Sequence, residues 1–364
     1  MIYEFIEQSI LSSVNILNGS SSWLIISFLI AGTLKNLVSP EKFQKMLGNK
    51  KFSSILKSIF SSLLLPVCSC GTFPLAISMY YSGAYLGPTL AFLTANPVMN
   101  PIAIILCYGL LGPKLTVIYI ITGLTLAIIV GIVANNFSGS EVCLYNSFGG
   151  QGAFDLEEEK PSIIQKIKRG INWAFTDLAM VVSKYVVLGM VLAGFILTIA
   201  QDNSIQKILG DPSMISLGGV AILAGIMYVC AVGHIPFIAA LIATGVAPGV
   251  AITFLMAGAA TNLPELLSLY KIIGKKAVLI YFSIITGGSL IGGYVANMIL
   301  LPNFKPVMDF DKVNHSVNTA NKFIITFPDW MKIICTIGIV VLGIIAIWKD
   351  LGIKYLNHKM KVEK

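Results

Sequence analysis

The chain has 364 residues, of which 56% are hydrophobic and only 12% are charged, and its mean hydropathy is +0.83. A soluble protein of this length has no use for so much apolar surface, so the composition excludes an ordinary soluble domain and predicts an integral membrane protein. The formal net charge of +8 comes from lysines in short loops beside apolar runs, which indicates membrane topology and not a nucleic-acid partner.

Apolar stretches long enough to cross a bilayer recur along the chain. A spanning helix needs roughly 20 mostly apolar residues, and stretches of that order lie at residues 21–34, 58–82, 84–113, 115–140, 185–201, 213–264, 277–304 and 323–348. Residues 2–17 carry Glu4, Glu7 and Gln8 among apolar positions and lack a basic n-region. We therefore expect an interfacial amphipathic helix there and no cleaved signal peptide.

The sequence repeats itself with an offset of 162 positions. Val67-Cys68-x-x-Gly71-x-x-Pro74 lies over Val229-Cys230-x-x-Gly233-x-x-Pro236, and Gly131-x-Val133-Ala134-Asn135 lies over Gly293-x-Val295-Ala296-Asn297. The matched glycines, prolines and asparagines would not align through shared hydrophobicity alone. The pattern therefore indicates a duplicated helical unit.

Lysines are distributed differently in the two copies. They crowd the first loop of copy one, at Lys35, Lys42, Lys45, Lys50, Lys51 and Lys57, and the later loop of copy two, at Lys271, Lys275 and Lys276. If lysine-rich loops face the cytoplasm, the copies have opposite orientation. The sequence thus predicts an all-α, multi-pass plasma-membrane protein of two inverted-topology repeats with discontinuous helices, its N-terminus outside and its C-terminus cytoplasmic.

The expected organisation follows from these patterns. Residues 1–137 form the first repeat, residues 138–162 a cytoplasmic linker loop, and residues 163–300 the second repeat, which opens with an amphipathic helix at 163–179. Residues 301–322 form a polar loop, residues 323–348 an extra C-terminal transmembrane helix, and residues 349–364 a basic cytoplasmic tail.

Two kinds of helix break are expected inside the repeats. The segment from Pro66 to Pro74 interrupts an apolar run with two prolines and a glycine, which remove a backbone donor and permit unusual dihedral angles. A second break, from Asn96 to Pro101, has its partner at residues 258–265. Unwound backbone at membrane depth must line protein or water and not lipid.

Cys68, Cys70, Cys230 and His234 form the sharpest cluster of candidate ligands. Cys68 and Cys230 are equivalent across the repeat, and thiolate with imidazole favours soft or borderline ions such as copper(I), zinc or trivalent arsenic. We expect these four residues to bind such an ion as transported substrate. Alternatively, small thiols pack well at helix crossings, and the histidine hydrogen-bonds a carbonyl.

Four further polar residues are candidates to line the substrate path: Asn100, Asn262, Thr261 and Glu265. Polar groups at this depth are costly, which favours a functional interpretation. The alternative for each asparagine is a helix cap. For Glu265, which follows Pro264, the functional interpretation is proton relay or neutralisation of a cation. The alternative is an acidic residue at a helix N-terminus, where the helix dipole favours it.

No phosphate-binding loop and no nucleophile elbow is present, so the sequence predicts neither an enzyme nor a bound cofactor. The expected partners are membrane lipid, a small thiophilic substrate and a possible coupling ion, while the oligomeric state is left open.

The motifs Pro66-Val-Cys-Ser-Cys-Gly71, Ala91-Phe-Leu-x-Ala-Asn-Pro97, Gly233-His-Ile-Pro236 and the segment 254–264 together resemble those of predicted permeases of the YraQ and ArsP type. The resemblance covers roughly residues 20–300. It implies an inner-membrane efflux permease without its own ATPase, associated with organoarsenical export or, in a subgroup, copper and zinc efflux. It places Cys68 and Cys70 on the cysteine motif.

The resulting hypothesis is export of a thiophilic metal or metalloid by alternating access, the direction following from the resemblance. A small-anion transporter for a sulfur oxyanion is one alternative, since the N-termini of half-helices favour anions. A metal-binding membrane sensor or scaffold without net flux is another.

Overall fold

The computed structural model describes residues 2–37, 47–63, 69–137, 163–200, 214–226, 246–301 and 328–362, with short pieces at 234–235, 238–239 and 241–242. Within these ranges the regular structure is helical and contains no strand. The expected all-α class is therefore confirmed.

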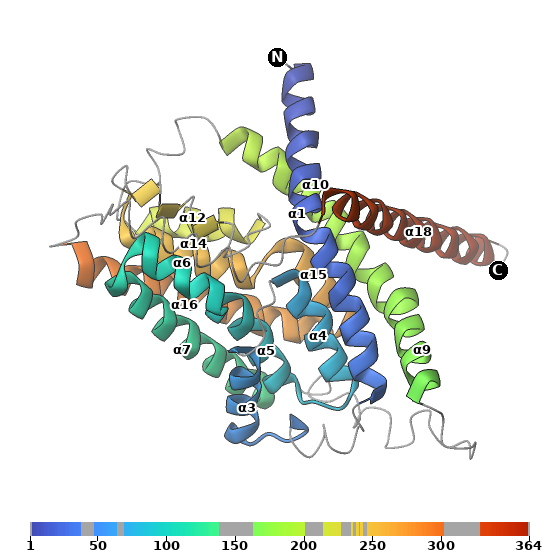
Figure 1. Ribbon diagram of the computed structural model, residues 1–364, viewed down its shortest axis with the longest axis horizontal. Coiled ribbons are helices and arrows are strands. Elements are labelled where there is room, and N and C mark those ends of the chain that lie inside the picture. The colour runs from blue at the N-terminus through green and yellow to red at the C-terminus, as the bar shows by residue number, and fades with distance from the viewer. Residues whose placement is uncertain are drawn as a thin grey trace.

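Helices of the two copies follow one another in matching order (Figure 1). Copy one contains α1 (Ile2–Leu37), α3 (Phe52–Leu63), α4 (Ser69–Tyr81), α5 (Leu86–Met99), α6 (Pro101–Leu111) and α7 (Pro113–Phe137). Copy two contains α9 (Ile163–Trp173), the π-helical turn η2 (Ala174–Leu178), α10 (Ala179–Ala200), α12 (Met214–Ile226), α14 (Pro248–Ala260), α15 (Leu263–Ile272) and α16 (Lys275–Leu300). The last helix, α18 (Asp329–Val362), lies outside both.

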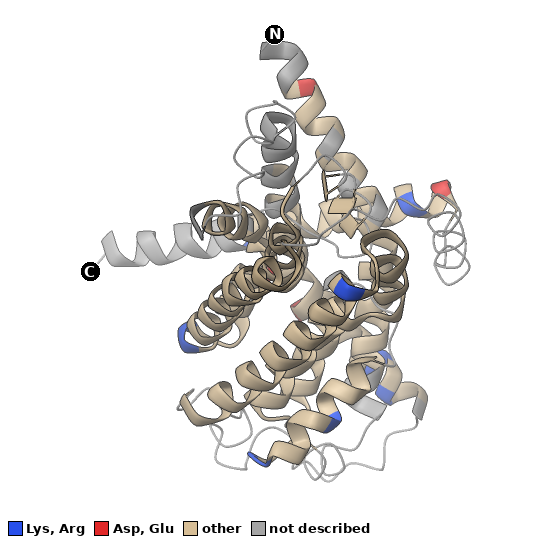
Figure 2. Ribbon diagram, turned by 90° about the vertical axis from the view of Figure 1, so that its left-hand side faces the viewer, with Lys and Arg blue, Asp and Glu red and all other residues tan. Residues whose placement is uncertain are grey.

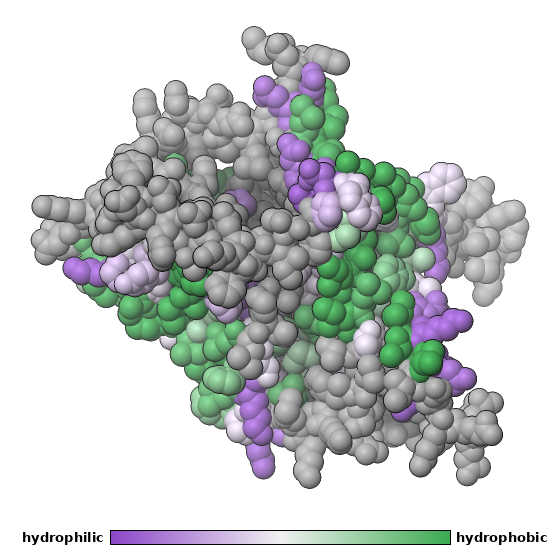
Figure 3. Space-filling view, in the orientation of Figure 1, coloured by the Kyte–Doolittle hydropathy of each residue, from purple (hydrophilic) through white to green (hydrophobic). Residues whose placement is uncertain are grey.

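Six helical segments in the described ranges are long and apolar enough to cross a membrane, or seven if the bent pair α5 and α6 forms one span. The protein is therefore a multi-pass membrane protein, as the composition predicts. The longest outer spans expose large apolar side chains, among them Ile121 on α7, Ile291 on α16 and Ile337 on α18. Hydrophobic atoms cover much of the described surface in Figure 3, and charged residues are sparse along the ribbon in Figure 2.

Three boundaries differ from the sequence expectation. Residues 2–17 are not a separate interfacial helix, because α1 runs without interruption from Ile2 to Leu37. The amphipathic segment at 163–179 likewise continues through η2 into α10. The helix expected at 323–348 begins at Asp329 and extends through the predicted tail to Val362. In each case no proline lies between the polar segment and the apolar one, so backbone hydrogen bonding continues the helix through both.

The packing of copy one is repeated in copy two. Helices α5 and α7 pack together, as do their equivalents α14 and α16, and α3 packs on α5 as α12 packs on α14. One hydrogen bond recurs with its partners shifted by the repeat offset. The Gly87 amide donates to Asn135 Oδ1 over 2.9 Å, and the Gly249 amide donates to Asn297 Oδ1 over 2.7 Å.

Equivalent helices of the two copies run in opposite directions. Gly288 of α16 faces Leu126 of α7, and one turn further along α16, Gly292 faces Thr122. The residue numbers rise along one helix and fall along the other, so α7 and α16 are antiparallel. Leu126 and Gly288 are themselves equivalent positions. A pseudo-twofold axis therefore passes near their contact and across the two helices. For helices that cross a membrane, such an axis lies in the membrane plane, the relation of inverted-topology repeats.

Helices α1 and α10 show the same antiparallel relation. Ser13 Oγ lies 3.5 Å from the Val191 carbonyl oxygen, while Phe28, further along α1, stacks edge-on against Phe175 with ring centroids 6.3 Å apart. The two copies share one hydrophobic core, to which α5 and α7 contribute together with α14 and α12. They are halves of one structure and not separate domains.

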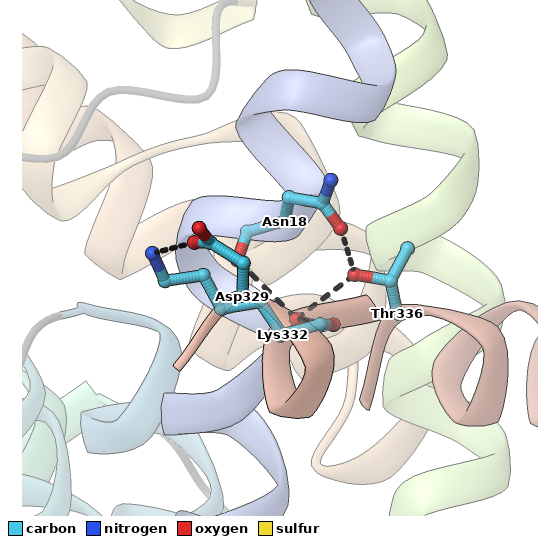
Figure 4. A network of polar contacts seen from close by, with 5 residues as sticks. Asn18, Asp329, Lys332 and Thr336 are labelled. Carbon is cyan, nitrogen blue, oxygen red and sulfur yellow. Dashed lines mark hydrogen bonds and ion pairs between the residues drawn. The ribbon is translucent and has the colours of Figure 1, made fainter. Parts of the chain in front are cut away.

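Helix α18 is fastened to α1 by a small polar network (Figure 4). Thr336 Oγ1 donates to Asn18 Oδ1 over 2.6 Å and lies 3.0 Å from Ser21 Oγ, which in turn donates to the Lys332 carbonyl over 3.2 Å. Lys332 also pairs with Asp329 at 2.9 Å. The network joins the extra helix to the first helix of copy one, and α18 also packs along α10.

Candidate functional site

The two central helices α5 and α14 are enclosed by protein along their whole length. Every residue of α5 and of α14 is buried. Helix α5 ends at Asn100, which starts α6, and α14 ends at Thr261, after which Asn262 starts α15. Both expected breaks are shorter than predicted, because residues 96–99 remain helical in α5 and residues 258–260 remain helical in α14. The helices are interrupted at Asn100 and at Thr261 and Asn262, which are buried in protein and not against lipid. Residues 69–74 of the other expected break are also helical, with Pro74 inside α4.

Asn100 caps the start of α6. It is 3% exposed, and its Oδ1 accepts a hydrogen bond from the Ile102 amide over 2.9 Å. Helices α5 and α6 are bent by 40° at this residue. The bend follows from Pro101, which disfavours the helical conformation at the residue before it, and Asn100 has an extended ψ of 130°.

Asn262 plays the equivalent part at the start of α15. Its Oδ1 accepts from the Glu265 amide over 3.1 Å, and its Nδ2 donates to Glu265 Oε2 over 2.9 Å. This is a reciprocal pairing of the capping-box kind, with side-chain amide replacing the backbone donor. Thr261 is fully buried and donates its hydroxyl to the Ala257 carbonyl over 2.6 Å. The cap interpretation of both asparagines is thus confirmed.

The predicted discontinuity is weaker in copy two. Helices α14 and α15 form a continuous candidate span from Pro248 to Ile272, of which 83% of the most apolar window is buried inside the protein. Here the proline lies two residues after the asparagine, at Pro264, and not directly after it as in copy one. It therefore occupies the first turn of α15, where a missing amide costs little.

Glu265 is buried, at 6% exposure, and only one of its carboxyl oxygens is satisfied. Oε2 accepts from Asn262, whereas Oε1 has no hydrogen-bond partner among the described residues. No basic side chain in the described ranges pairs with it. On α16, the fully buried Tyr281 lies within electrostatic range of Glu265 and within reach of the Thr94 side chain of α5. The Tyr281 hydroxyl itself has no hydrogen-bond partner among the described residues, so two unsatisfied polar groups lie near each other in copy two.

Of the four predicted cysteine and histidine ligands, the structure describes only Cys70, by its backbone, and His234. Cys68 and Cys230 lie outside the described residues, and of Cys70 the structure describes the backbone, in the first turn of α4. His234 is partly buried, and its ring lies 5.9 Å from that of Phe254 on α14. No group of three or more metal-ligating residues occurs in the described ranges. Whether the four predicted ligands approach one another stays a prediction.

The described ligand-bearing segments nevertheless flank the central helices. Helix α4, which begins at Ser69 beside the cysteine motif, packs against α5, and His234 contacts α14. Neither Thr94 nor Tyr281 is among the site residues predicted from the sequence, although Tyr281 matches Tyr119 across the repeat. This match of two tyrosines within apolar helices could have pointed to a polar site, since a tyrosine hydroxyl buried in an apolar helix usually has a polar neighbour.

Two oppositely directed halves, one shared core and buried polar groups at paired helix breaks define a membrane permease. The chain belongs to the ArsP_1 family, described as predicted permeases, which matches residues 8–298. The resemblance drawn from the sequence motifs is therefore confirmed.

Relatives are similar over most of their lengths. UPF0718 protein MJ0584 of Methanocaldococcus jannaschii is 25% identical, over 76% of this chain and 91% of the relative. A putative two-component membrane permease complex subunit of Streptococcus mutans is 22% identical, over 71% and 84%. UPF0718 protein YraQ of Escherichia coli is 21% identical, over 74% and 75%. No solved structure matches the chain.

Proposed function

We propose that this permease exports a small thiophilic substrate across the plasma membrane by alternating access. The substrate class is a soft or borderline metal ion, such as copper or zinc, or a trivalent or organic arsenic compound. The observation that carries the proposal is the pair of antiparallel, equivalent halves that meet at two buried helices, each ending in a break. Inverted-repeat transporters bind their substrates at such breaks, near the bilayer midplane.

The chemistry of the substrate rests on the residues beside those helices. Cys68 precedes α4 in the sequence, Cys70 lies in the first turn of α4, and α4 packs on α5. His234 lies beside Phe254 of α14, and Cys230 is the repeat equivalent of Cys68. Thiolates and an imidazole from the two halves would present soft ligands from both sides of one path. Asn100, Thr261 and Asn262 would line this path with their remaining polar atoms. The N-terminus is proposed to be outside and the C-terminus cytoplasmic.

An anionic substrate is less well supported by the same geometry. At α15 the helix start is already occupied by the Asn262 side chain and by the Glu265 carboxyl group. An oxyanion there would meet a carboxyl group instead of free backbone amides. The positive end of the α15 dipole already interacts with Asn262 and Glu265. At the start of α6, the Asn100 side chain likewise accepts a hydrogen bond from the Ile102 amide.

The test is a growth and accumulation assay in a metal-sensitive host. Cells expressing the wild type, Cys68→Ser/Cys70→Ser or Cys335→Ser are exposed to zinc, copper, arsenite and methylarsenite. Cys335 lies in α18, outside both repeats, and is the matched control. We expect the wild type and the control, but not the double variant, to lower the cell content of one species. If no species responds to the wild type, the proposed substrate class is wrong.

A further inference from the structure

Glu265 is a carboxyl group that the packing of the protein alone does not explain. As the third residue of α15 it satisfies the cap with one oxygen, and a glutamine would do this as well. The second oxygen is buried without a partner in the described ranges. Leaving a buried polar atom unsatisfied destabilises the folded protein, and more so if the atom is charged. A carboxyl group kept in such a place within a membrane span indicates a function.

The pseudo-symmetry isolates this group further. The repeat places Asn100 opposite Asn262 and Tyr119 opposite Tyr281, but Ala103 opposite Glu265. The two halves therefore share the cap and the buried tyrosine, while only copy two carries an ionisable carboxyl group at this position. Glu265 therefore adds to one of two equivalent helix starts a carboxyl group whose charge can change.

The surroundings of the carboxyl group favour a proton over a metal ion as its ligand. In the described ranges Glu265 belongs to no group of three or more metal-ligating side chains, and the side chains that interact with it are those of Asn262 and Tyr281. A magnesium or calcium ion needs more oxygen ligands than these residues supply. Helices α10 and α16 pack on α15. On α10, Lys184 lies over the ring of its neighbour Tyr185, and the described titratable group that interacts with Glu265 is Tyr281.

We propose that Glu265 is a proton-binding site that couples proton movement to substrate movement, an inference that rests on the proposed transport function. Oε1 takes a proton from water on one side of the membrane and releases it on the other side when the halves change orientation. The carboxyl group alternates between a charge of −1 and 0. Asn262 holds the other oxygen in place, and Tyr281, whose buried hydroxyl has no hydrogen-bond partner among the described residues, lies near the carboxyl group.

The experiment uses the purified full-length protein in liposomes, with zinc and methylarsenite as probes. Each probe is measured first for exchange at equal pH and then for accumulation driven by a gradient of one pH unit. With the membrane potential held at zero by equal potassium concentrations and valinomycin, one proton coupled per substrate gives about tenfold accumulation, because one pH unit is a tenfold ratio of proton activity. We expect the wild type to respond and Glu265→Gln to show no gradient-driven accumulation. Ser268→Ala, which loses a local hydrogen bond to the Pro264 carbonyl, is the control.

The outcomes separate the two proposals. Exchange without any response to the gradient, or an equal response in Glu265→Gln, overturns the proton site and leaves the transport function standing. If the wild type exchanges neither probe, infrared difference spectra between acidic and alkaline buffer decide. A carboxyl band that changes in the wild type and is absent in Glu265→Gln supports the site, and its absence from both overturns it. Glu265→Met replaces Glu265→Gln should that variant not fold.

Discussion

The central helices begin at side chains supplied by other helices, and this predicts a measurable loss of stability. Asn297→Ala removes the oxygen that accepts the Gly249 amide over 2.7 Å at the first turn of α14. The amide remains buried, since every residue of α14 is buried. A buried donor without an acceptor costs about 1–3 kcal/mol, or roughly 5- to 150-fold in the unfolding equilibrium. Asn135→Ala should cost as much through Gly87, because the geometry is repeated.

The measurement is unfolding by sodium dodecyl sulfate in mixed micelles, followed by circular dichroism. Asn136→Ala is the matched control, because Asn136 is the exposed neighbour of Asn135 on the same helix. The free energy of unfolding of both cap variants should fall below that of the control. If both lie within about 0.5 kcal/mol of it, the usual range of surface substitutions, the caps do not hold the central helices and the reasoning is wrong.

Two further variants probe the packing of the halves and of the extra helix. Gly249→Ala should destabilise by several kcal/mol or prevent folding, because a β-carbon there collides with the backbone oxygen of Gly293, which cannot move aside. Gly287→Ala, with open space around its position, should be neutral or stabilise by up to about 1 kcal/mol in the same unfolding assay. Thr336→Val should lower stability by about 0.5–1.5 kcal/mol through lost contacts to α1, whereas Thr125→Val, which bonds only within its own helix, should cost less.

The outcomes against these expectations are equally definite. If Gly249→Ala and Gly287→Ala have the same free energy of unfolding, α14 and α16 lie further apart than described. A loss in Thr125→Val as large as that in Thr336→Val would mean that the polar network between α18 and α1 adds nothing to the helix's own hydrogen bonds.

Much of the architecture could be predicted from the sequence because its signals are local or periodic. Apolar runs of membrane length predict spans, and the match of rare glycines and asparagines at a constant offset predicts a repeat. Asn100 and Asn262 could be expected to start helices, since asparagine before or near proline is a helix-start signal in any context. The lysine distribution pointed to opposite orientation, and α7 and α16 are antiparallel.

Other features depended on contacts between distant segments. Asn135 and Asn297 were visible as repeated residues, but that each caps a helix 48 positions earlier follows only from packing. The break in copy two is milder than in copy one because Pro264 lies in the first turn of α15, two residues after the capping Asn262, whereas Pro101 directly follows Asn100. The continuation of α1 and α18 through polar segments likewise reflects cooperative helix propagation, which residue polarity does not reveal.

The sequence by itself determined the membrane class, the duplicated unit and the family, because hydropathy and repeated residue identities are properties of the chain as written. Only the tertiary structure decided that Glu265 is enclosed with one oxygen unsatisfied, and that the buried Tyr281 of α16 lies near it. Burial and partnership of a side chain depend on which helices meet around it. That meeting is set by the packing of both halves together, which no local pattern contains.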